Sequence, residues 1–327
     1  MNERLFVFLI LLALPLSGAW AQIQNPKSEI VNHIELPRRA FFGIRMEPVT
    51  EDVQRVMNLP AVKGVLIQDV IPGSTAQAAG LKQGDVLLEL DGREVRSPDE
   101  AVRMVGAYRA GQALHYKLIR DGKTITEKTV IQGLPGEKYP DLEVTYGLVQ
   151  AGDALLRTIV SKPKKRIGKS PALLFIQGIG CYSMDTPFDT ARTELQLINR
   201  LVRDGWIVMR VDKSGIGDSQ GTPCDQIDFN TELEGYMQAF ESLQKQDDVD
   251  VENCFIFGHS MGGVMAPLVA KEHSVKGIVA YGTIGVNFME YFANSRRTIA
   301  ASYEMTPAET DDYIKEQCDC AAMLLSA

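Results

Sequence analysis

The pattern of hydrophobic positions changes at about residue 142. Beyond it, short apolar runs alternate with amphipathic stretches of helical period, and the run at 172–176 is apolar without interruption. A strand has this composition when both of its faces are buried in a parallel sheet. The pattern predicts strands at 142–150, 154–161, 172–176, 206–211, 254–257 and 275–281, and helices at 190–204, at 230–245 and after Ser260. Such alternation predicts a doubly wound, mostly parallel α/β sheet.

Residues 38–132 follow a different pattern, that of short strands with one clear helix. Ser97 is a good N-cap for this helix, Pro98 suits its first position, and Glu100 completes a capping box. The pair Asp121-Gly122 lies between two alternating runs and favours a type I′ turn, so it predicts a hairpin. We therefore expect a small β-rich domain here.

The amino-terminal stretch has the pattern of an export signal. Arg4 precedes an apolar run at 5–16, and small residues up to Ala21 form an A-x-A end. The run is shorter than the roughly 20 residues that a membrane span needs. We expect cleavage before Gln22, no stable membrane anchor, and export to a bacterial periplasm or secretion. The boundaries predicted for the chain are a signal peptide at 1–21, a linker at 22–37, the β-rich domain at 38–132, a linker at 133–141 and the α/β domain at 142–327.

Composition excludes several classes of function. Of the 327 residues, 45% are hydrophobic and 23% are charged, which is ordinary for globular domains, and the net charge is −8. A protein that binds nucleic acid would present a clustered basic face. The one basic run, at 162–166, contains a proline and predicts a solvated loop. The five cysteines have no zinc-like spacing with the histidines. We expect no nucleic-acid partner, no metal and no cofactor.

Two motifs at 38–132 carry a family resemblance. One is the run PGSTAQAAGLKQGDVLLELDG at 72–92, and the other is the run AFFGI at 40–44. Together they resemble a PDZ domain of the bacterial protease type. The glycines of the longer run are expected to make turns, because glycine adopts backbone conformations that other residues avoid.

The PDZ resemblance implies a binding site for a peptide or protein C-terminus. The backbone N–H groups of Phe42, Gly43 and Ile44 would form a nest for the terminal carboxylate, and the peptide would add as a strand to the sheet edge. The helix that starts at Pro98 would form the other wall. PDZ modules also bind internal segments or their own chain, and Phe41 or Phe42 is also suited to the core.

A third motif lies at residues 258–262, where Gly258, Ser260 and Gly262 fit the pattern G-x-S-x-G. An apolar strand is predicted before the motif and a helix after it. In this pattern the serine occupies a tight strand-to-helix turn, and the glycines let strand and helix pass closely.

Two further runs agree with this motif, one at 176–180 and the other at 211–221. The three together resemble the α/β-hydrolase superfamily over about 142–281, nearest to its serine aminopeptidase and acyl-esterase branch. The resemblance implies that Ser260 is a nucleophile that attacks an ester or amide carbonyl. It also implies that the backbone N–H groups of Met261 and Ile179 stabilise the oxyanion, so that a small acyl or peptidyl group is the expected substrate.

The remaining residues of these loops are expected to have structural roles. Gln177 stands where the superfamily usually has histidine, and it would brace the loop. Asp212 and Ser214 would order their own loop rather than act as the catalytic acid. In the resembled fold, Cys181 and Cys224 follow loops over adjacent strands, so we hypothesise a disulfide between them, with two free thiols as the alternative. Cys254 would be an inert core thiol, and Cys318 and Cys320 an incidental pair in a mobile end.

The superfamily's catalytic acid and histidine follow the nucleophile along the chain. None of the four histidines, His33, His115, His259 and His273, fits the required position after the last strand. The runs at 286–303 and from Thr306 resemble the helices of a cap, so we expect an α/β-hydrolase domain that is incomplete from about 286. Either the chain is a fragment of a longer serine hydrolase, which we favour, or it is a non-catalytic PDZ peptide-binding protein with a hydrolase-like scaffold.

Overall fold

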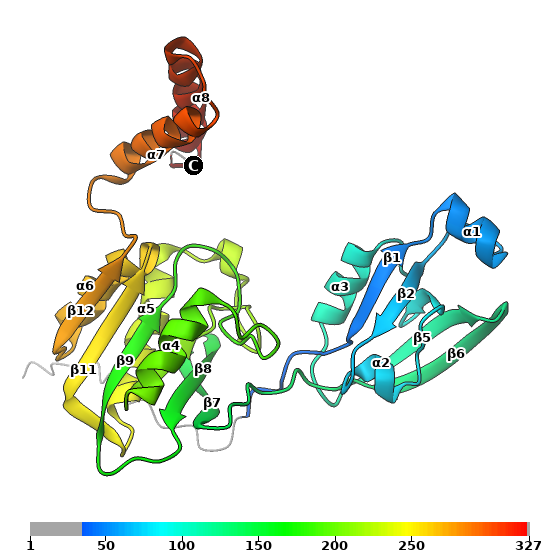
Figure 1. The fold of residues 1–327 in the computed structure, drawn as a ribbon, viewed down its shortest axis with the longest axis horizontal. Coiled ribbons are helices and arrows are strands. Elements are labelled where there is room, and N and C mark those ends of the chain that lie inside the picture. Colours follow the sequence, from blue (N-terminus) through cyan, green and yellow to red (C-terminus); the bar gives the residue numbers. More distant parts are fainter. Residues whose placement is uncertain (1–34, 326–327) are drawn as a thin grey trace, which may run out of the picture. The chain divides into compact units, whose positions relative to one another are not determined.

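The computed structural model describes residues 35–325 (Figure 1). The expectations for the signal peptide, for its cleavage before Gln22 and for His33 lie outside the described residues. Among the helices of the described part, none is both long and apolar enough to cross a membrane.

The β-rich domain is built on a sheet of strand order β1-β2-β3-β5-β6, with β4 paired to β3. Its strands are all antiparallel to their neighbours. The elements are β1 Ile44–Pro48, α1 Glu51–Met57, β2 Val65–Val70, α2 Thr75–Ala78, β3 Val86–Leu90, β4 Arg93–Glu94, α3 Pro98–Gly106, β5 Ala113–Arg120 and β6 Lys123–Val130.

Side-chain caps mark the helices of this domain. The hydroxyl of Ser97 accepts a hydrogen bond from the N–H of Glu100, whose carboxylate accepts one from the N–H of Arg96, so the predicted helix start is confirmed. Thr50 and Ser74 cap α1 and α2 in the same way. These two short helices were not predicted, because neither is long enough to show a helical period.

The second sheet has the strand order β12-β11-β9-β10-β8-β7 (Figure 1). Strands β9 to β12 run parallel to one another. Strand β8 runs antiparallel to β10, and β7 runs antiparallel to β8. The predicted doubly wound, mostly parallel sheet is therefore confirmed. Its elements are β7 Leu142–Ala151, β8 Ala154–Pro163, β9 Ser170–Ile176, α4 Thr193–Arg203, β10 Ile207–Val211, a 3-10 turn at Cys224–Gln226, α5 Phe229–Gln244, β11 Val249–His259, α6 Met261–Glu272, β12 Gly277–Tyr281, α7 Phe288–Ser302 and α8 Pro307–Leu325.

Helices cover both faces of this sheet. Leu174 and Ile176 point to the face packed by α5 and α6, whereas Leu173 and Phe175 point to the face packed by α4. Successive residues of a strand face opposite sides, so a strand covered twice must be apolar throughout. This is the physical reason for the uninterrupted apolar run at 172–176.

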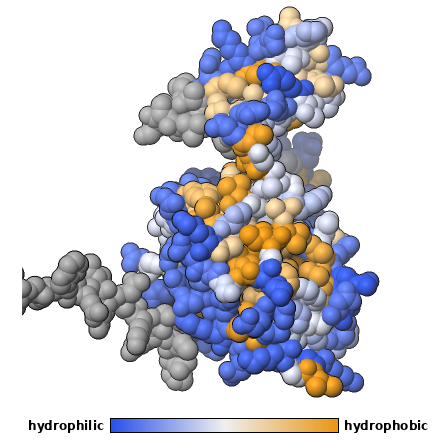
Figure 2. Space-filling view, turned by 90° about the vertical axis from the view of Figure 1, so that its left-hand side faces the viewer, coloured by the Kyte–Doolittle hydropathy of each residue, from blue (hydrophilic) through white to orange (hydrophobic). Residues whose placement is uncertain are grey.

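Within residues 35–325, strand β12 forms one edge of the sheet, where it pairs with β11 alone. Ile278, Val279 and Tyr281 are 40%, 48% and 66% exposed. Hydrophobic side chains gather on the molecular face that Figure 2 shows, which is the side of β12 and α6 in Figure 1. Beyond β12, helices α7 and α8 contact each other.

Candidate active site

Ser260 lies at the junction of β11 and α6, on a strained backbone. Its φ is 55° and its ψ is −118°, a conformation that residues other than glycine rarely adopt. The surroundings hold it there: its N–H donates to the carbonyl of Tyr281 at 2.9 Å, and its own carbonyl accepts from the N–H of Gly263 at 3.0 Å. Such strain persists where neighbours over-determine the backbone, and it is common at reactive residues.

The two glycines of the motif allow this turn to exist. A Cβ atom on Gly258 would lie 2.2 Å from the carbonyl oxygen of Gly262, and one on Gly262 would lie 2.3 Å from the carbonyl oxygen of Ile176. Both distances are far below a van der Waals contact. The turn therefore brings the end of β9 directly against the start of α6.

This close approach places the predicted oxyanion loop beside Ser260, the predicted nucleophile. A Cβ atom on Gly178 would lie 3.0 Å from the Cβ of Ser260. Met261 is the first residue of α6, so its N–H has no partner within the helix and lies at the positive end of the helix dipole. Ile179 follows Gly178 and is 72% exposed. The fold thus brings the segment of Ile179 to the turn that carries Ser260 and Met261.

Covalent and polar contacts support the loop from its far side. Cys181 and Cys224 form a disulfide, with their Cα atoms 5.7 Å apart. The side-chain amide of Gln177 donates to the carbonyl of Tyr182 at 3.4 Å, in keeping with the predicted bracing role. Cys254 is a buried free thiol, as expected.

Asp212 joins two loops of the site. Its carboxylate accepts hydrogen bonds from the N–H of Met184 at 2.6 Å and from the hydroxyl of Ser183 at 2.8 Å. Burial raises the pKa of Asp212 to about 6, and these two hydrogen bonds oppose the rise. The hydroxyl of Ser214 donates to the carbonyl of Thr222 at 2.7 Å. Both residues therefore order loops, as the sequence predicted.

The histidines of residues 35–325 have other surroundings. His115 is hydrogen-bonded through its backbone N–H to Asp91 in the β-rich domain. The ring of His273 packs edge-on against Phe240, with centroids 5.5 Å apart. The ring of His259 lies 5.9 Å from that of Tyr281, centroid to centroid. The described residues therefore supply no histidine in the position after the last strand, which the superfamily's order requires. They also hold no group of three or more His, Cys, Asp or Glu that could bind a metal ion.

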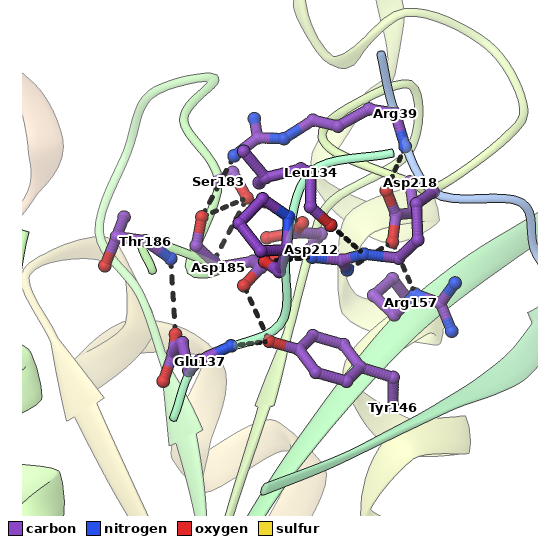
Figure 3. A network of polar contacts seen from close by, with 12 residues as sticks. Arg39, Leu134, Glu137, Tyr146, Arg157, Ser183, Asp185, Thr186, Asp212 and Asp218 are labelled. Carbon is purple, nitrogen blue, oxygen red and sulfur yellow. Dashed lines mark hydrogen bonds and ion pairs between the residues drawn. The ribbon is translucent and has the colours of Figure 1, made fainter. Parts of the chain in front are cut away.

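A buried ionic network lies next to these loops (Figure 3). The guanidinium of Arg38 donates to Asp185 and to Asp218, each at 2.6 Å. Asp218 also pairs with Arg157 at 3.0 Å, and both of these side chains are almost fully buried. Because Asp185 follows Ser183 and Met184, the network connects the chain before β1 to the loop that Asp212 holds.

A fully buried pair forms the other end of this network. The guanidinium of Arg210 in β10 contacts the carboxylate of Glu137 at 2.8 Å. Glu137 also accepts from the N–H of Thr186 at 3.2 Å, and its own N–H donates to the hydroxyl of Tyr146 (Figure 3). Sequence analysis missed this pair, although an arginine in the middle of an otherwise apolar strand is a signal for a buried partner.

Three carbonyl groups fix the backbone of the loop in the β-rich domain that is predicted to bind a peptide. The carbonyls of Phe41, Phe42 and Gly43 accept hydrogen bonds from the N–H groups of Thr75, Ala76 and Ile71 at 2.9, 2.9 and 2.8 Å. In a trans peptide the C=O and the next N–H point in opposite directions, so the N–H groups of Phe42 and Gly43 face away from α2 and the N–H of Ile44 faces away from Ile71. Gly43 has a φ of 69°, and a Cβ there would lie 2.2 Å from that of Ser74. Only glycine fits this turn.

Comparison with known families agrees with the two sequence resemblances. A PDZ domain model matches residues 40–130, and a model described as serine aminopeptidase, S33, matches residues 189–295. The chain contains a PDZ domain followed by an α/β-hydrolase domain. The second match includes the turn at Ser260 as well as helices α4 to α6.

Individual relatives match parts of the chain. A probable periplasmic serine endoprotease DegP-like protein of Rhizobium meliloti (strain 1021) is 34% identical over 99 residues, which is 30% of this chain and 20% of that protein. The chain spans about a fifth of the length of the curated relatives that it matches in this way. Among solved structures, hypothetical protein PA2218 from Pseudomonas aeruginosa is 16% identical with a TM-score of 0.39, covering 51% of this chain and 56% of that one.

Proposed function

We propose that this protein is an exported serine hydrolase that cleaves ester or peptide bonds through an acyl-enzyme on Ser260, and that its PDZ domain recruits or gates a peptide substrate. The strained conformation of Ser260 between the tightly packed ends of β9 and α6 carries this proposal. A residue that served only to connect a strand to a helix would have no need of such a conformation.

The expected reaction follows from the placement of the donors. The hydroxyl oxygen of Ser260 attacks the substrate carbonyl carbon, and a base takes the hydroxyl proton. The negative charge that forms on the carbonyl oxygen is stabilised by the N–H groups of Met261 and Ile179. The carbonyl then re-forms as the alcohol or amine leaves with a proton, and water hydrolyses the resulting acyl-serine.

Neither the base nor the acid of this reaction is assigned to a residue within 35–325. The three histidines within that range lie in other surroundings, as described above. Export is proposed from the amino-terminal pattern, and the periplasmic location named for the DegP-like relative is consistent with it. The PDZ ligand is proposed to be a peptide or protein C-terminus, held by the nest at 42–44.

One observation favours a second function, that of a non-catalytic peptide-binding protein. The residues of the proposed nest all lie within 35–325, whereas none of the histidines in that range stands after the last strand. A fluorophosphonate probe separates the two functions, because it reacts covalently with an activated serine. We expect labelling of the protein isolated from its natural source, and loss of labelling in the Ser260→Ala variant. An unlabelled natural protein that still binds peptides through its PDZ domain would establish the second function.

A further inference from the structure

Lys213 is a buried lysine without a role in the reaction proposed above. It follows Asp212 at the carboxyl end of β10 and is only 4% exposed. Its Nζ lies 2.8 Å from Oε1 of Glu232 in α5, and it donates a hydrogen bond to the carbonyl of Gly178 at 2.9 Å. A buried ion pair is often no more stabilising than apolar side chains of the same shape. Stability alone therefore gives little reason for an ammonium group at this position.

The carbonyl that Lys213 binds belongs to the peptide unit that carries the N–H of Ile179. The described residues contain no cis peptide bond, so this C=O and this N–H point in opposite directions. Because the carbonyl of Gly178 points to Lys213, the N–H of Ile179 points away from it. The same peptide begins beside Ser260, at the contact described for Gly178.

This peptide has little else to fix its orientation. Gly178 and Gly180 stand on either side of Ile179, and the φ of Gly180 is 122°, a value open mainly to glycine. The Ile179 side chain is largely exposed, so packing does not hold it. The Gly178–Ile179 peptide turns through ψ of Gly178 and φ of Ile179, and because glycine has no Cβ, rotation on the Gly178 side costs little unless the carbonyl is held.

We propose that Lys213 is a positioning residue that holds the Gly178–Ile179 peptide in the orientation in which the Ile179 N–H meets the oxyanion. The proposal rests on the roles proposed above for Ser260 and Ile179. An ammonium group at the carbonyl also polarises the peptide, which strengthens its N–H as a donor. Glu232 keeps the ammonium in place, and the Cys181–Cys224 disulfide anchors the far end of the loop.

The test compares Lys213→Met with a matched control, Lys162→Met. Lys162 is also a shielded lysine paired with a carboxylate, Asp248, at 2.7 Å. Asp248 accepts a hydrogen bond from the N–H of Ser170 at the start of β9, whereas Gly178 follows the other end of that strand. Three quantities are measured in each protein: the rate of fluorophosphonate labelling, the amide resonance of Ile179 after selective ¹⁵N-isoleucine labelling, and the free energy of unfolding in urea.

We expect Lys213→Met to lower the maximal labelling rate by roughly 10- to 100-fold, with little change in the probe's apparent affinity. This loss of rate should not exceed the loss that follows removal of one oxyanion donor. The Ile179 amide resonance should move as well. Lys162→Met should change neither quantity, even where it lowers stability to a similar extent. Glu232→Gln, which loosens the ammonium without removing it, should give an intermediate loss of rate and serves if Lys213→Met does not fold.

The proposal is overturned if a folded Lys213→Met or Glu232→Gln variant keeps both the wild-type labelling rate and the wild-type Ile179 resonance. Failure of the wild-type protein to react with the probe would instead contradict the role of Ser260. In that case the Ile179 resonance alone decides whether Lys213 orients the peptide, because this signal does not depend on catalysis.

Discussion

Strands β10 and β12 belong to the same sheet and have similar apolar sequences, IVMRV and GIVAY, yet their surroundings differ. Every residue of β10 is buried, between two neighbouring strands and between α4 on one face and α5 on the other. In β12, Ile278, Val279 and Tyr281 are exposed, and β11 is the one paired strand among the described residues. The apolar sequence of a strand shows that the strand is suited to burial. Whether it is buried depends on strands and helices from distant parts of the chain that pack against it.

The protein interior around β10 is closely packed and holds a buried, paired charge. Arg210 is fully buried and is neutralised by Glu137, which lies just before β7. Such a pair is tolerable only where both partners stay in place, because an unpaired buried charge is strongly destabilising. The exposed edge at β12 has no comparable constraint, and this difference can be measured.

The largest effect is expected from Arg210→Ala. The substitution leaves the carboxylate of Glu137 buried without its partner, so the free energy of unfolding should fall by roughly 3–5 kcal/mol in urea denaturation. Arg200→Ala is the control, since Arg200 forms an exposed ion pair with Asp204 whose loss should cost about 1 kcal/mol or less. A loss below about 1 kcal/mol for Arg210→Ala would show that Glu137 is solvated or protonated instead.

The next effect is a matched pair of truncations, Ile207→Ala in β10 and Ile278→Ala in β12. Ile207 is completely buried, so its truncation should cost about 2–5 kcal/mol by creating a cavity. Ile278 is 40% exposed, and its truncation should cost about 1 kcal/mol or less. Equal losses in chemical denaturation would mean that β12 is covered in solution, and the contrast between the two strands would then disappear.

A third effect concerns the pH dependence of stability at the end of β10. Burial raises the pKa of Asp212 from its ordinary 3.8 to about 6, so the folded state favours the protonated carboxyl. The stability from this group is fully present below pH 4 and is lost as the pH rises to 6, by roughly 3 kcal/mol. Unfolding free energies of the wild type and of Asp212→Asn, measured from pH 4 to pH 7, should differ by an amount that changes with pH. A constant difference would argue against a raised pKa.

The smallest effect concerns the strained backbone of Ser260, which follows β11, the strand that pairs with the exposed β12. Ser260→Gly and Ser260→Ala both remove the nucleophile, but only glycine relieves the positive φ. The glycine variant should be more stable than the alanine variant by about 1 kcal/mol in thermal unfolding, and neither should react with a fluorophosphonate. A glycine variant that is less stable than the alanine variant would show that the backbone at Ser260 is not strained.

Much of the fold was predictable because the evidence for it is local. Uninterrupted apolar runs gave the buried strands, and Ser97 with Glu100 gave a helix start, because each depends on neighbours within a few residues. The turn at Ser260 was predictable for the same reason, since the glycines that permit it stand two residues away on either side.

The remainder could not be predicted, because it depends on contacts between distant residues. Glu137, the partner of Arg210, lies 73 positions before it, and Gly178, whose carbonyl Lys213 binds, lies 35 positions before that lysine. Nothing in the local pattern around either residue names its partner. The local sequence of β12 has the composition of a covered strand, so it does not by itself show the exposure.

The two ends of the PDZ domain meet at one point of the fold. Ala40 and Gly133 form an antiparallel bridge, and the N–H of Leu134 donates to the carbonyl of Arg39 at 2.9 Å. Leu36, just before this point, is buried, and its carbonyl accepts a hydrogen bond from Arg157 of β8. The hydrolase domain thus holds the chain on both sides of the PDZ domain.

This arrangement has a consequence for the evolution and engineering of the protein. Paired residues of two antiparallel strands lie only about 5 Å apart, so a short turn would close the chain if the PDZ domain were removed. Both connections of the PDZ domain to the rest of the chain therefore lie at one place in the fold. Recombination just before Ala40 and just after Gly133, which are neighbours in the fold, would therefore exchange one recognition module for another and leave the hydrolase sheet unchanged.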